Sequence, residues 1–394
     1  MNIQHMRTWA EVNLDAVAHN FNSVKKAAGT RVCCVIKADA YGHGAVMLAK
    51  KYQSLGADFL AVSNIEEAIQ LRRVDVTLPI LILGYTPASA AKELAEQNIS
   101  QCLYSLDYAR ELSKAAQKDG VTVKVHVKID TGMSRLGFFC QNIERDYAVA
   151  DEIDEAVHLP GLEAEGIFTH FAVSDEGEDG EAYSKAQFNS FCDIIDDLEY
   201  NGITFKYHHC ANSAAIEDYA DTHLDMVRAG IILYGLEPSD KVKNPLDLIP
   251  ALSLKSVISH VKSIPANTDV SYGRTYTSDK KIRVATVAIG YADGFLRKFN
   301  ASSVIVRGVK CPIIGRVCMD QLMIDLGDMD DVGIGEVVTL IGKDVNEEIT
   351  ADNLAKYADT INYEVVCGIG ARVPRVYTEN GKEVYVLDYI CPEE

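Results

Sequence analysis

The pattern of hydrophobic and polar positions changes near residue 240 of the chain. Before that point, short apolar runs alternate with longer amphipathic stretches such as residues 64–74 and 105–120, which is typical of alternating strands and helices. The eight apolar runs are residues 31–37, 58–63, 79–84, 100–104, 123–129, 164–170, 205–210 and 224–230. Eight such units in about 240 residues predict an α/β fold, an N-terminal (β/α)8 TIM barrel.

Beyond a proline-containing stretch at residues 238–250, the pattern becomes a two-residue alternation. This alternation predicts strands in a C-terminal, mostly-β domain, with a hairpin turn at Asn380-Gly381. The predicted strands lie within residues 251–264, 281–291, 303–315, 321–327, 336–342 and 372–387. We place the barrel at residues 1–245 and the β domain at 246–394, and we expect residues before about 14 to pair with the latter.

Composition narrows the classes of partner. The chain has 57 acidic and 38 basic residues and a formal charge of -19, without a basic stripe, which disfavours nucleic acid and anionic membranes. No apolar run is long enough to span a bilayer and the N-terminal residues lack an apolar signal core, so we expect a cytoplasmic protein. Ten cysteines occur without a C-x-x-C pair, which favours reduced thiols over a metal site.

Reactive side chains recur where the predicted barrel strands end. They are Lys37 on the first strand, Lys128, Asp130 and Arg135 at or beyond the end of the fifth, His170 on the sixth, Asn212 and Ser213 after the seventh, and Arg228 within the eighth. Each alone is more often structural, since a strand-end lysine usually extends its ammonium to water. Because barrel active sites lie at the C-terminal ends of the strands, polar groups on five of eight strands predict such a site.

A lysine in this position suggests imine chemistry. A partly desolvated lysine can hold a carbonyl group as an imine, and its commonest partner is pyridoxal 5'-phosphate (PLP). The phosphate of PLP requires an anion site. Ser213 begins a short predicted helix, and Gly230 and Ile231 offer further backbone N–H groups.

Several motifs together resemble the bacterial alanine racemase family. They are VIKADAYGHG (35–44), HVKIDTGMSRLG (126–137), HCANSAA (209–215), MVRAGIILYG (226–235), VSYGRTY (270–276) and GRVCMDQ (315–321). The resemblance covers nearly the whole chain and keeps the family's order. It implies a PLP-dependent racemase that interconverts L- and D-alanine for peptidoglycan, acting as a head-to-tail homodimer whose active sites are completed by the neighbour's β domain.

The resemblance also implies individual roles. Lys37 matches the lysine that holds PLP, and Tyr272 matches a second base from the partner subunit. Racemisation removes a proton from one face of Cα and returns it to the other, so two bases are required. The implied cofactor contacts are Tyr41, His170, Asn212, Ser213, Arg228, Gly230 and Ile231. The implied substrate contacts are Arg135, Met319 and Tyr291, with Lys128 matching a lysine that is often carbamylated.

One position departs from the family pattern. Ala371 stands where many members have a tyrosine before RVPR, and the smaller side chain should loosen one wall of the pocket. A serine or broad small-amino-acid racemase is therefore an alternative. A PLP-dependent decarboxylase and a non-catalytic PLP carrier are further alternatives, and a barrel without PLP would follow if Lys37 only extended into water.

Overall fold

The structure, a computed structural model, describes residues 6–391 and falls into two compact units. The first, here the barrel unit, comprises Ala18–Ala40 and Ala45–Ile249. The second, here the β unit, comprises the described residues up to Val17, Tyr41–Gly44 and those from Pro250 onward. The α/β fold class predicted from the sequence, a barrel followed by a mostly-β domain, is confirmed.

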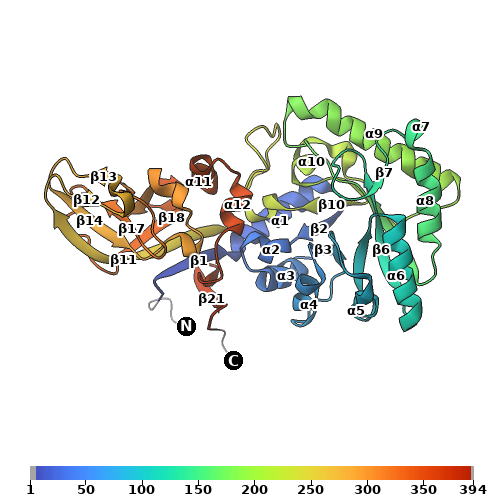
Figure 1. Ribbon diagram of the computed structural model, residues 1–394, viewed down its shortest axis with the longest axis horizontal. Coiled ribbons are helices and arrows are strands. Elements are labelled where there is room, and N and C mark those ends of the chain that lie inside the picture. Colours follow the sequence, from blue (N-terminus) through green and yellow to red (C-terminus); the bar gives the residue numbers. More distant parts are fainter. Residues whose placement is uncertain (1–5, 392–394) are drawn as a thin grey trace. The chain divides into compact units, whose positions relative to one another are not determined.

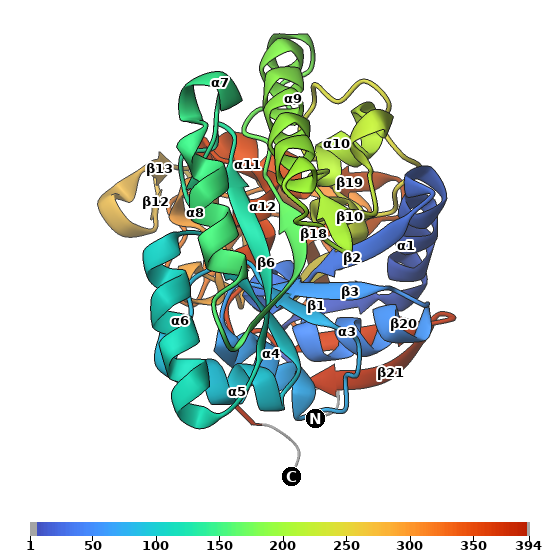
Figure 2. The same cartoon turned by 90° about the vertical axis from the view of Figure 1, so that its right-hand side faces the viewer.

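The barrel unit contains all eight predicted strands, joined in parallel. In spatial order they are β10 (Met226–Ala229), β2 (Arg31–Val35), β3 (Phe59–Val62), β4 (Ile80–Ile82), β5 (Ile99–Leu103), β6 (Val123–Asp130), β8 (Leu162–Phe168) and β9 (Tyr207–His209). The short β7 (Phe138–Phe139) pairs with β6. Helices lie around the outside of the strands (Figure 2). They include α1 (Leu14–Ala28), α3 (Ala45–Ser54), α4 (Ile65–Arg72), α5 (Ala91–Glu96), α6 (Leu106–Asp119), α7 (Ile143–Asp146), α8 (Ala148–Val157), α9 (Glu178–Tyr200) and α10 (Ser213–Asp218).

The ring of strands closes between β9 and β10 without a regular ladder. Two backbone hydrogen bonds join the edges: Arg228 N–H donates to the Ala211 carbonyl at 2.9 Å, and Asp225 N–H donates to the His208 carbonyl at 3.2 Å. A ladder would occupy successive N–H and C=O groups along both strands. Because this seam lacks one, backbone and side-chain groups at the C-terminal ends of β9 and β10 remain available for other contacts.

The first barrel strand ends earlier than the sequence predicted. β2 stops at Val35, and Lys37 begins α2 (Lys37–Tyr41), in which four successive non-glycine residues, Ala38 to Tyr41, have φ between 52° and 55°. This left-handed turn costs roughly 1–2 kcal/mol per residue. Two carboxylates support it: Glu67 Oε1 accepts from Ala38 N–H at 2.7 Å and Asp39 Oδ1 accepts from Ala45 N–H at 2.8 Å. His170 likewise lies beyond its strand, since β8 ends at Phe168.

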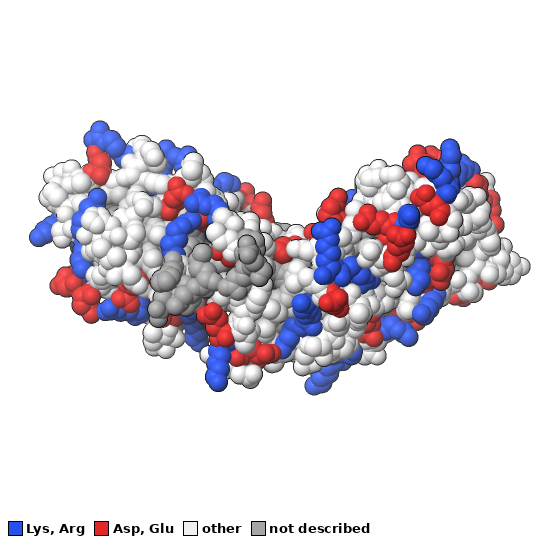
Figure 3. Space-filling model, turned by 90° about the horizontal axis from the view of Figure 1, so that it is seen from below, with Lys and Arg blue, Asp and Glu red and all other residues white. Residues whose placement is uncertain are grey.

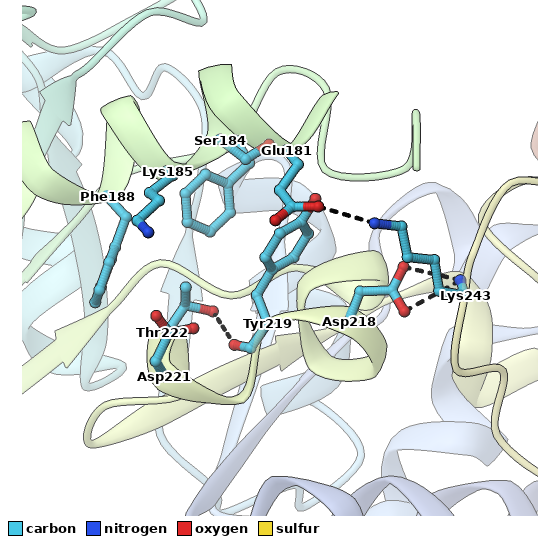
Figure 4. Close-up of a pocket in the computed structure, with 10 residues that line it drawn as sticks. Glu181, Ser184, Lys185, Phe188, Asp218, Tyr219, Asp221, Thr222 and Lys243 are labelled. Carbon is cyan, nitrogen blue, oxygen red and sulfur yellow. Dashed lines mark hydrogen bonds and ion pairs between the residues drawn. The ribbon is translucent and has the colours of Figure 1, made fainter. Parts of the chain in front are cut away.

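Carboxylate side chains bind the segment that follows the last barrel strand and hold it next to α10. Asp218 accepts hydrogen bonds from the backbone N–H groups of Lys243 and Asn244 at 2.9–3.1 Å, and the Lys243 ammonium donates to Glu181 of α9 at 2.8 Å. These groups line a hollow of about 330 Å³ beside α9 (Figure 4). Most of the charged groups in this hollow therefore bind one another or the backbone, so their role is to hold the structure together.

The β unit is built on one large sheet (Figure 1). Its strands are β1 (Thr8–Asn13), β11 (Leu252–Ile264), β14 (Ile282–Val287), β15 (Ser303–Val306), β16 (Val309–Pro312), β17 (Leu322–Asp325), β18 (Val337–Asp344), β19 (Glu347–Ile349), β20 (Arg375–Glu379) and β21 (Lys382–Leu387), with the separate pair β12 (Asp269–Val270) and β13 (Tyr276–Thr277) and the helices α11 (Ala351–Ala358) and α12 (Asn362–Cys367). β1 pairs antiparallel with β11 and parallel with β20. The predicted hairpin at Asn380-Gly381 is confirmed, with both residues at positive φ between β20 and β21.

Charged side chains of both signs are mixed on the face drawn in Figure 3. None of the helices in residues 6–391 is long and apolar enough to cross a membrane.

Arg375 holds the segment containing Gly42 within the β unit. This arginine is only 2% exposed, and its guanidinium donates to the carbonyls of Gly42, Ile369, Gly370 and Val373 at 2.5–2.9 Å. A Cβ on Gly42 would lie 2.2 Å from the Val366 carbonyl oxygen. The glycine is therefore required by close packing as well as by its φ of +80°.

Gly42→Ala should destabilise the protein far more than Gly56→Ala. Both glycines have φ +80°, but a Cβ on Gly56 meets nothing within 4 Å, so Gly56→Ala measures the left-handed conformation alone. We expect about 1 kcal/mol for Gly56→Ala and at least about 3 kcal/mol for Gly42→Ala, because a backbone carbonyl must shift. Urea unfolding of the two variants checks this, and equal losses would contradict the packing argument.

Candidate active site

The side chain of Arg228 is the most completely bonded charged group at the barrel seam. It is 4% exposed, and Nη1 donates to the His209 carbonyl at 2.9 Å and lies 3.0 Å from His209 Nδ1. Nη2 donates to the carbonyls of Thr169 and Cys210 at 2.7 and 3.1 Å and lies 3.2 Å from His170 Nδ1. Among residues 6–391 no carboxylate forms an ion pair with this guanidinium, and its Nε–H has no acceptor. One donor of Arg228 is therefore available to a ligand.

Burial and the guanidinium charge keep the neighbouring bases neutral. Desolvation lowers the pKa of Arg228 itself to about 10. The pKa values of His170 and His209 are held well below their usual value, first by burial and then by the positive charge of Arg228. Because arginine can only donate, each imidazole must present an unprotonated Nδ1 to it. Each neutral ring therefore carries its proton on Nε2.

The ammonium of Lys128 and the guanidinium of Arg228 both lie near the ring of Phe168. It is 5% exposed, its Nζ lies 5.2 Å from the centre of the Phe168 ring, and the Arg228 guanidinium lies 5.3 Å from the same ring. Burial, followed by the charge of Arg228, lowers the pKa of Lys128 to about 7. A substantial fraction of this amine is therefore unprotonated, and nucleophilic, near neutral pH.

Backbone N–H groups and a hydroxyl gather beyond the ends of β9 and β10. Asn212 caps α10 by accepting from Ala215 N–H at 3.1 Å, and it also accepts from the Ser174 hydroxyl at 2.9 Å. Ser213 Oγ accepts from Gly230 N–H at 2.9 Å, which ties the two loops together. Ile231 begins the 3-10 helix η4 (Ile231–Tyr234). The first N–H groups of both helices have no acceptor within their own helix, as an anion site requires.

Two further predicted residues lie at the same end of the barrel. Lys37 begins the left-handed turn after β2, and its positive charge contributes to the lowered pKa of His170. Arg135 is exposed on the loop after β6, where Asp130 Oδ1 accepts from the N–H groups of Gly132 and Ser134 at 3.1 and 2.9 Å. The barrel unit thus brings together all the site residues predicted within it.

The remaining predicted residues belong to the β unit. Tyr272 (67% exposed), Met319 (53%) and Tyr291 (43%) are exposed and lie around adjoining hollows, with Tyr272 lining both. Tyr291 N–H donates to the Cys318 carbonyl at 3.0 Å, which fixes the two loops to each other. Exposed apolar side chains gathered in this way mark contact surfaces.

Tyr41, by contrast, is buried in the β unit, with its ring centre 6.0 Å from that of Tyr363. Burial raises the pKa of its phenol well above the usual value. Its hydroxyl is therefore neutral and can both donate and accept a hydrogen bond.

The donors of the barrel unit fit PLP by their chemistry. Lys37 would hold the aldehyde carbon, and the Nε–H of Arg228 would donate to the ring nitrogen. The N–H groups of Ser213 and Ile231 would receive the phosphate, while the Gly230 N–H is engaged by Ser213 Oγ and supports the loop. No group of three or more His, Cys, Asp or Glu side chains in the described part of the chain is placed to hold a metal ion.

Sequence reasoning missed three polar residues inside the barrel: His126, Glu165 and His209. They form a buried chain of hydrogen bonds that ends at Arg228. A signal for His126 was present, because residues two apart on a strand share a face, and His126 precedes Lys128 by two. Glu165 gave no such signal, since it lies at an irregularity of β8.

Comparison with known proteins gives a consistent result. Residues 12–238 match the family described as "Alanine racemase, N-terminal domain", and residues 251–377 match "Alanine racemase, C-terminal domain". The chain is 46% identical over 387 residues to alanine racemase 2 of Caldanaerobacter subterraneus subsp. tengcongensis, covering 97% of this chain and 98% of that protein.

Solved structures agree in fold over nearly the whole chain. Alanine racemase from Clostridium difficile 630 superposes with a TM-score of 0.93 at 43% identity, covering 99% of this chain and 100% of that one. A crystal structure of alanine racemase from Bacillus anthracis with bound L-Ala-P superposes with a TM-score of 0.91 at 39% identity, covering 98% of each chain.

The lowered pKa of Lys128 predicts a specific pH dependence of stability. Between pH 7 and about 10 the unfolded chain holds a proton on this amine that the folded protein lacks, so the amine's contribution to stability increases with pH. Relative to Lys128→Met, native protein should gain more than about 1 kcal/mol over this range, since one pKa unit is about 1.4 kcal/mol. Urea unfolding in CO2-free buffers measures the difference; a pH-independent value would contradict the lowered pKa.

Proposed function

The chain belongs to the alanine racemase family of amino-acid racemases, and we propose on that premise that it interconverts L- and D-alanine with PLP held by Lys37. The observation that carries the proposal is Arg228 at the barrel seam. In the part of the chain that the structure describes, protein acceptors engage four N–H donors of its guanidinium and leave one open, at the strand ends where Lys37 and Ser213 also lie.

When bound, PLP supplies the electron sink that stabilises negative charge at the substrate Cα. The residues of this chain determine how strongly negative charge is drawn away from Cα. Arg228 would hold the ring nitrogen by donating a hydrogen bond, and because a guanidinium is scarcely ever deprotonated it would not supply that nitrogen with a proton. A weaker sink favours simple proton return over side reactions, because negative charge is less widely delocalised away from Cα.

Two bases exchange the proton. The Nζ of Lys37 takes or returns a proton on one face of the substrate Cα, and the Oη of Tyr272 acts on the other. A phenol needs nearby positive charge or a hydrogen-bond donor to serve as a base. The Nδ1 of His170 faces Arg228, and within residues 6–391 its Nε2–H has no acceptor, so it can supply such a donor.

Tyr272 acts, in this proposal, from the partner subunit of a head-to-tail homodimer. The exposure of Tyr272, Met319 and Tyr291 on one surface supports this assignment, because large apolar side chains left half in water mark contact sites. In the assembled site, Met319 would contact the substrate carboxylate through its backbone and Tyr291 would narrow the entrance.

Arg135 and Lys128 complete recognition of the substrate. The Arg135 guanidinium would bind near the substrate carboxylate, and Lys128 would hold it in place after reacting with CO2 to form a carbamate. The pKa of Lys128, about 7 through burial and the charge of Arg228, supports this, since carbamylation requires the neutral amine.

Biologically, we propose that the D-alanine serves peptidoglycan synthesis in the cytoplasm. A serine or broad small-amino-acid racemase remains the second candidate, because Ala371 is a small, exposed residue in the turn before β20. Family membership favours a racemase over the decarboxylase and the carrier.

Turnover of L-alanine and L-serine by the PLP-loaded protein distinguishes the two substrates. We expect alanine to be favoured by more than about tenfold in kcat/KM, a difference of about 1.4 kcal/mol in transition-state binding. Lys37→Ala is the blank, and Ala371→Tyr is the matched variant that should widen the preference by filling space. A preference for serine would identify the second candidate, and absence of turnover with either would reject the proposal.

Mixing two inactive variants tests the shared site. Lys37→Ala and Tyr272→Phe should each be inactive, but a mixed dimer would have one site with both native residues. Random reassociation should then restore about a quarter of native activity, since about half of the dimers are mixed and each has one working site. Analytical ultracentrifugation checks the dimer itself. Failure to recover activity from exchanged dimers would place Lys37 and Tyr272 in the same subunit's site.

A further inference from the structure

A chain of hydrogen bonds crosses the interior of the barrel from Arg228 to a carboxylate. His209 Nδ1 lies 3.0 Å from Arg228 Nη1, and His209 Nε2 lies 2.9 Å from His126 Nδ1. His126 Nε2 lies 3.3 Å from Glu165 Oε1, which also accepts from the Ser100 hydroxyl at 2.5 Å. Both imidazoles are completely buried. Barrel interiors are usually filled by branched apolar side chains, so this polar chain requires a reason.

The groups at the two ends of this chain of hydrogen bonds, Arg228 and Glu165, require the same direction of donation along it. Arg228 can only donate, so His209 Nδ1 accepts and its proton lies on Nε2. That proton is donated to His126 Nδ1, so the proton of His126 also lies on Nε2, facing Glu165. The ionised carboxylate of Glu165 can only accept a hydrogen bond, so it requires the same proton position on His126. Burial raises the pKa of Glu165, but hydrogen bonds from His126 and Ser100 outweigh it and leave the pKa below its usual value.

An irregularity of β8 brings Glu165 into the chain. Val125 of β6 pairs with Ala164 and His126 pairs with Gly166, so Glu165 is the unopposed residue of a bulge. Bulges are rare between parallel strands and commonly redirect a side chain near an active site. The next residue, Gly166, leaves room for the imidazole, since a Cβ there would lie 2.4 Å from His126 Nδ1.

Stacked rings hold the two histidines in place along the chain. The His209 ring stacks on Phe168 with centres 4.8 Å apart and planes within 4°, and the His126 ring stacks on Tyr207 with centres 6.0 Å apart. The rings are thus fixed in orientation by packing, while the position of each proton is decided by the groups at the two ends. Of these ends, the carboxylate is the one that mutation can change without touching the cofactor site.

We propose that Glu165 is a positioning residue for racemisation, acting through the protonation pattern of His126 and His209 on the orientation of Arg228. The inference rests on the proposed function, because it concerns the arginine that faces the cofactor ring. Without an acceptor at Glu165, the buried Nε2–H of His126 loses its hydrogen bond, and only Arg228 still opposes the reversed arrangement. The cost of that unpaired donor favours moving the proton of His126 to Nδ1 and that of His209 to its own Nδ1. An N–H would then face the Arg228 Nη1–H, and the guanidinium would turn away from its position.

The protonation pattern of the native protein is the first test. Long-range 1H–15N spectra of 15N-histidine-labelled, PLP-loaded protein should show both His126 and His209 protonated on Nε2, with resonances assigned through His126→Gln and His209→Gln. A proton on Nδ1 of either ring would overturn the proposal. This measurement does not depend on turnover, so it separates failure of the inference from failure of the racemase assignment.

The second test removes the acceptor. In Glu165→Met the protonation of both histidines on Nε2 should be lost. The kcat for L-alanine should fall by about tenfold or more, which is the usual loss when a residue that supports a site group is removed. KM and the PLP dissociation constant should change less than about threefold. Glu165→Gln retains an acceptor oxygen and should recover the nitrogen pattern and most of kcat.

Glu163→Met is the matched control, because Glu163 is an exposed carboxylate on the same strand. It should leave both the nitrogen pattern and kcat unchanged. The proposal would be wrong if Glu165→Met kept the Nε2–H pattern, if it changed the pattern with kcat within about twofold of native, or if Glu163→Met lost as much activity as Glu165→Met.

Discussion

The buried guanidinium of Arg228, which has no carboxylate beside it among the described residues 6–391, sets the main constraint on this structure. Charge removed from water requires either an opposite charge or full hydrogen bonding, and Arg228 has the second. Three backbone carbonyls and two imidazole nitrogens surround it. The carbonyls of His209 and Cys210 are available because the barrel closes at β9 and β10 by two isolated backbone hydrogen bonds, and Thr169 and His170 add acceptors from the end of β8. The seam of the fold and the candidate active site are therefore the same place.

Burial, and after it the same positive charge, keeps the bases around Arg228 from binding a proton. Burial and Arg228 keep His170 and His209 neutral and lower the pKa of Lys128 to about 7. A neutral imidazole has one donor and one acceptor, so it can pass on the direction of a hydrogen bond, whereas a protonated ring cannot. The polar interior of the barrel thus forms an ordered network, which a buried polar group needs if it is not to destabilise the fold.

Much of the fold could be predicted from the sequence because the patterns that specify strands and turns are local. Alternating apolar runs predicted all eight barrel strands, and Asn380-Gly381 predicted a hairpin. The end of β2 was less accurate, since the apolar run continues to Lys37 while the backbone turns into a left-handed conformation after Val35. Such a turn requires carboxylate support from Glu67 and Asp39, and Glu67 comes from a different element of the chain.

The sequence by itself determined the order of the strands, the residues at their C-terminal ends and the family, since periodicity and motif spacing are properties of neighbouring residues. Only the tertiary structure decided the burial, the pKa values and the hydrogen-bond partners of those residues. The lowered pKa of Lys128, the open donor of Arg228 and the inclusion of Glu165 through a bulge depend on burial and on atoms from strands far apart in the chain. Electrostatics and hydrogen bonding act through space, so no pattern along one strand could reveal them.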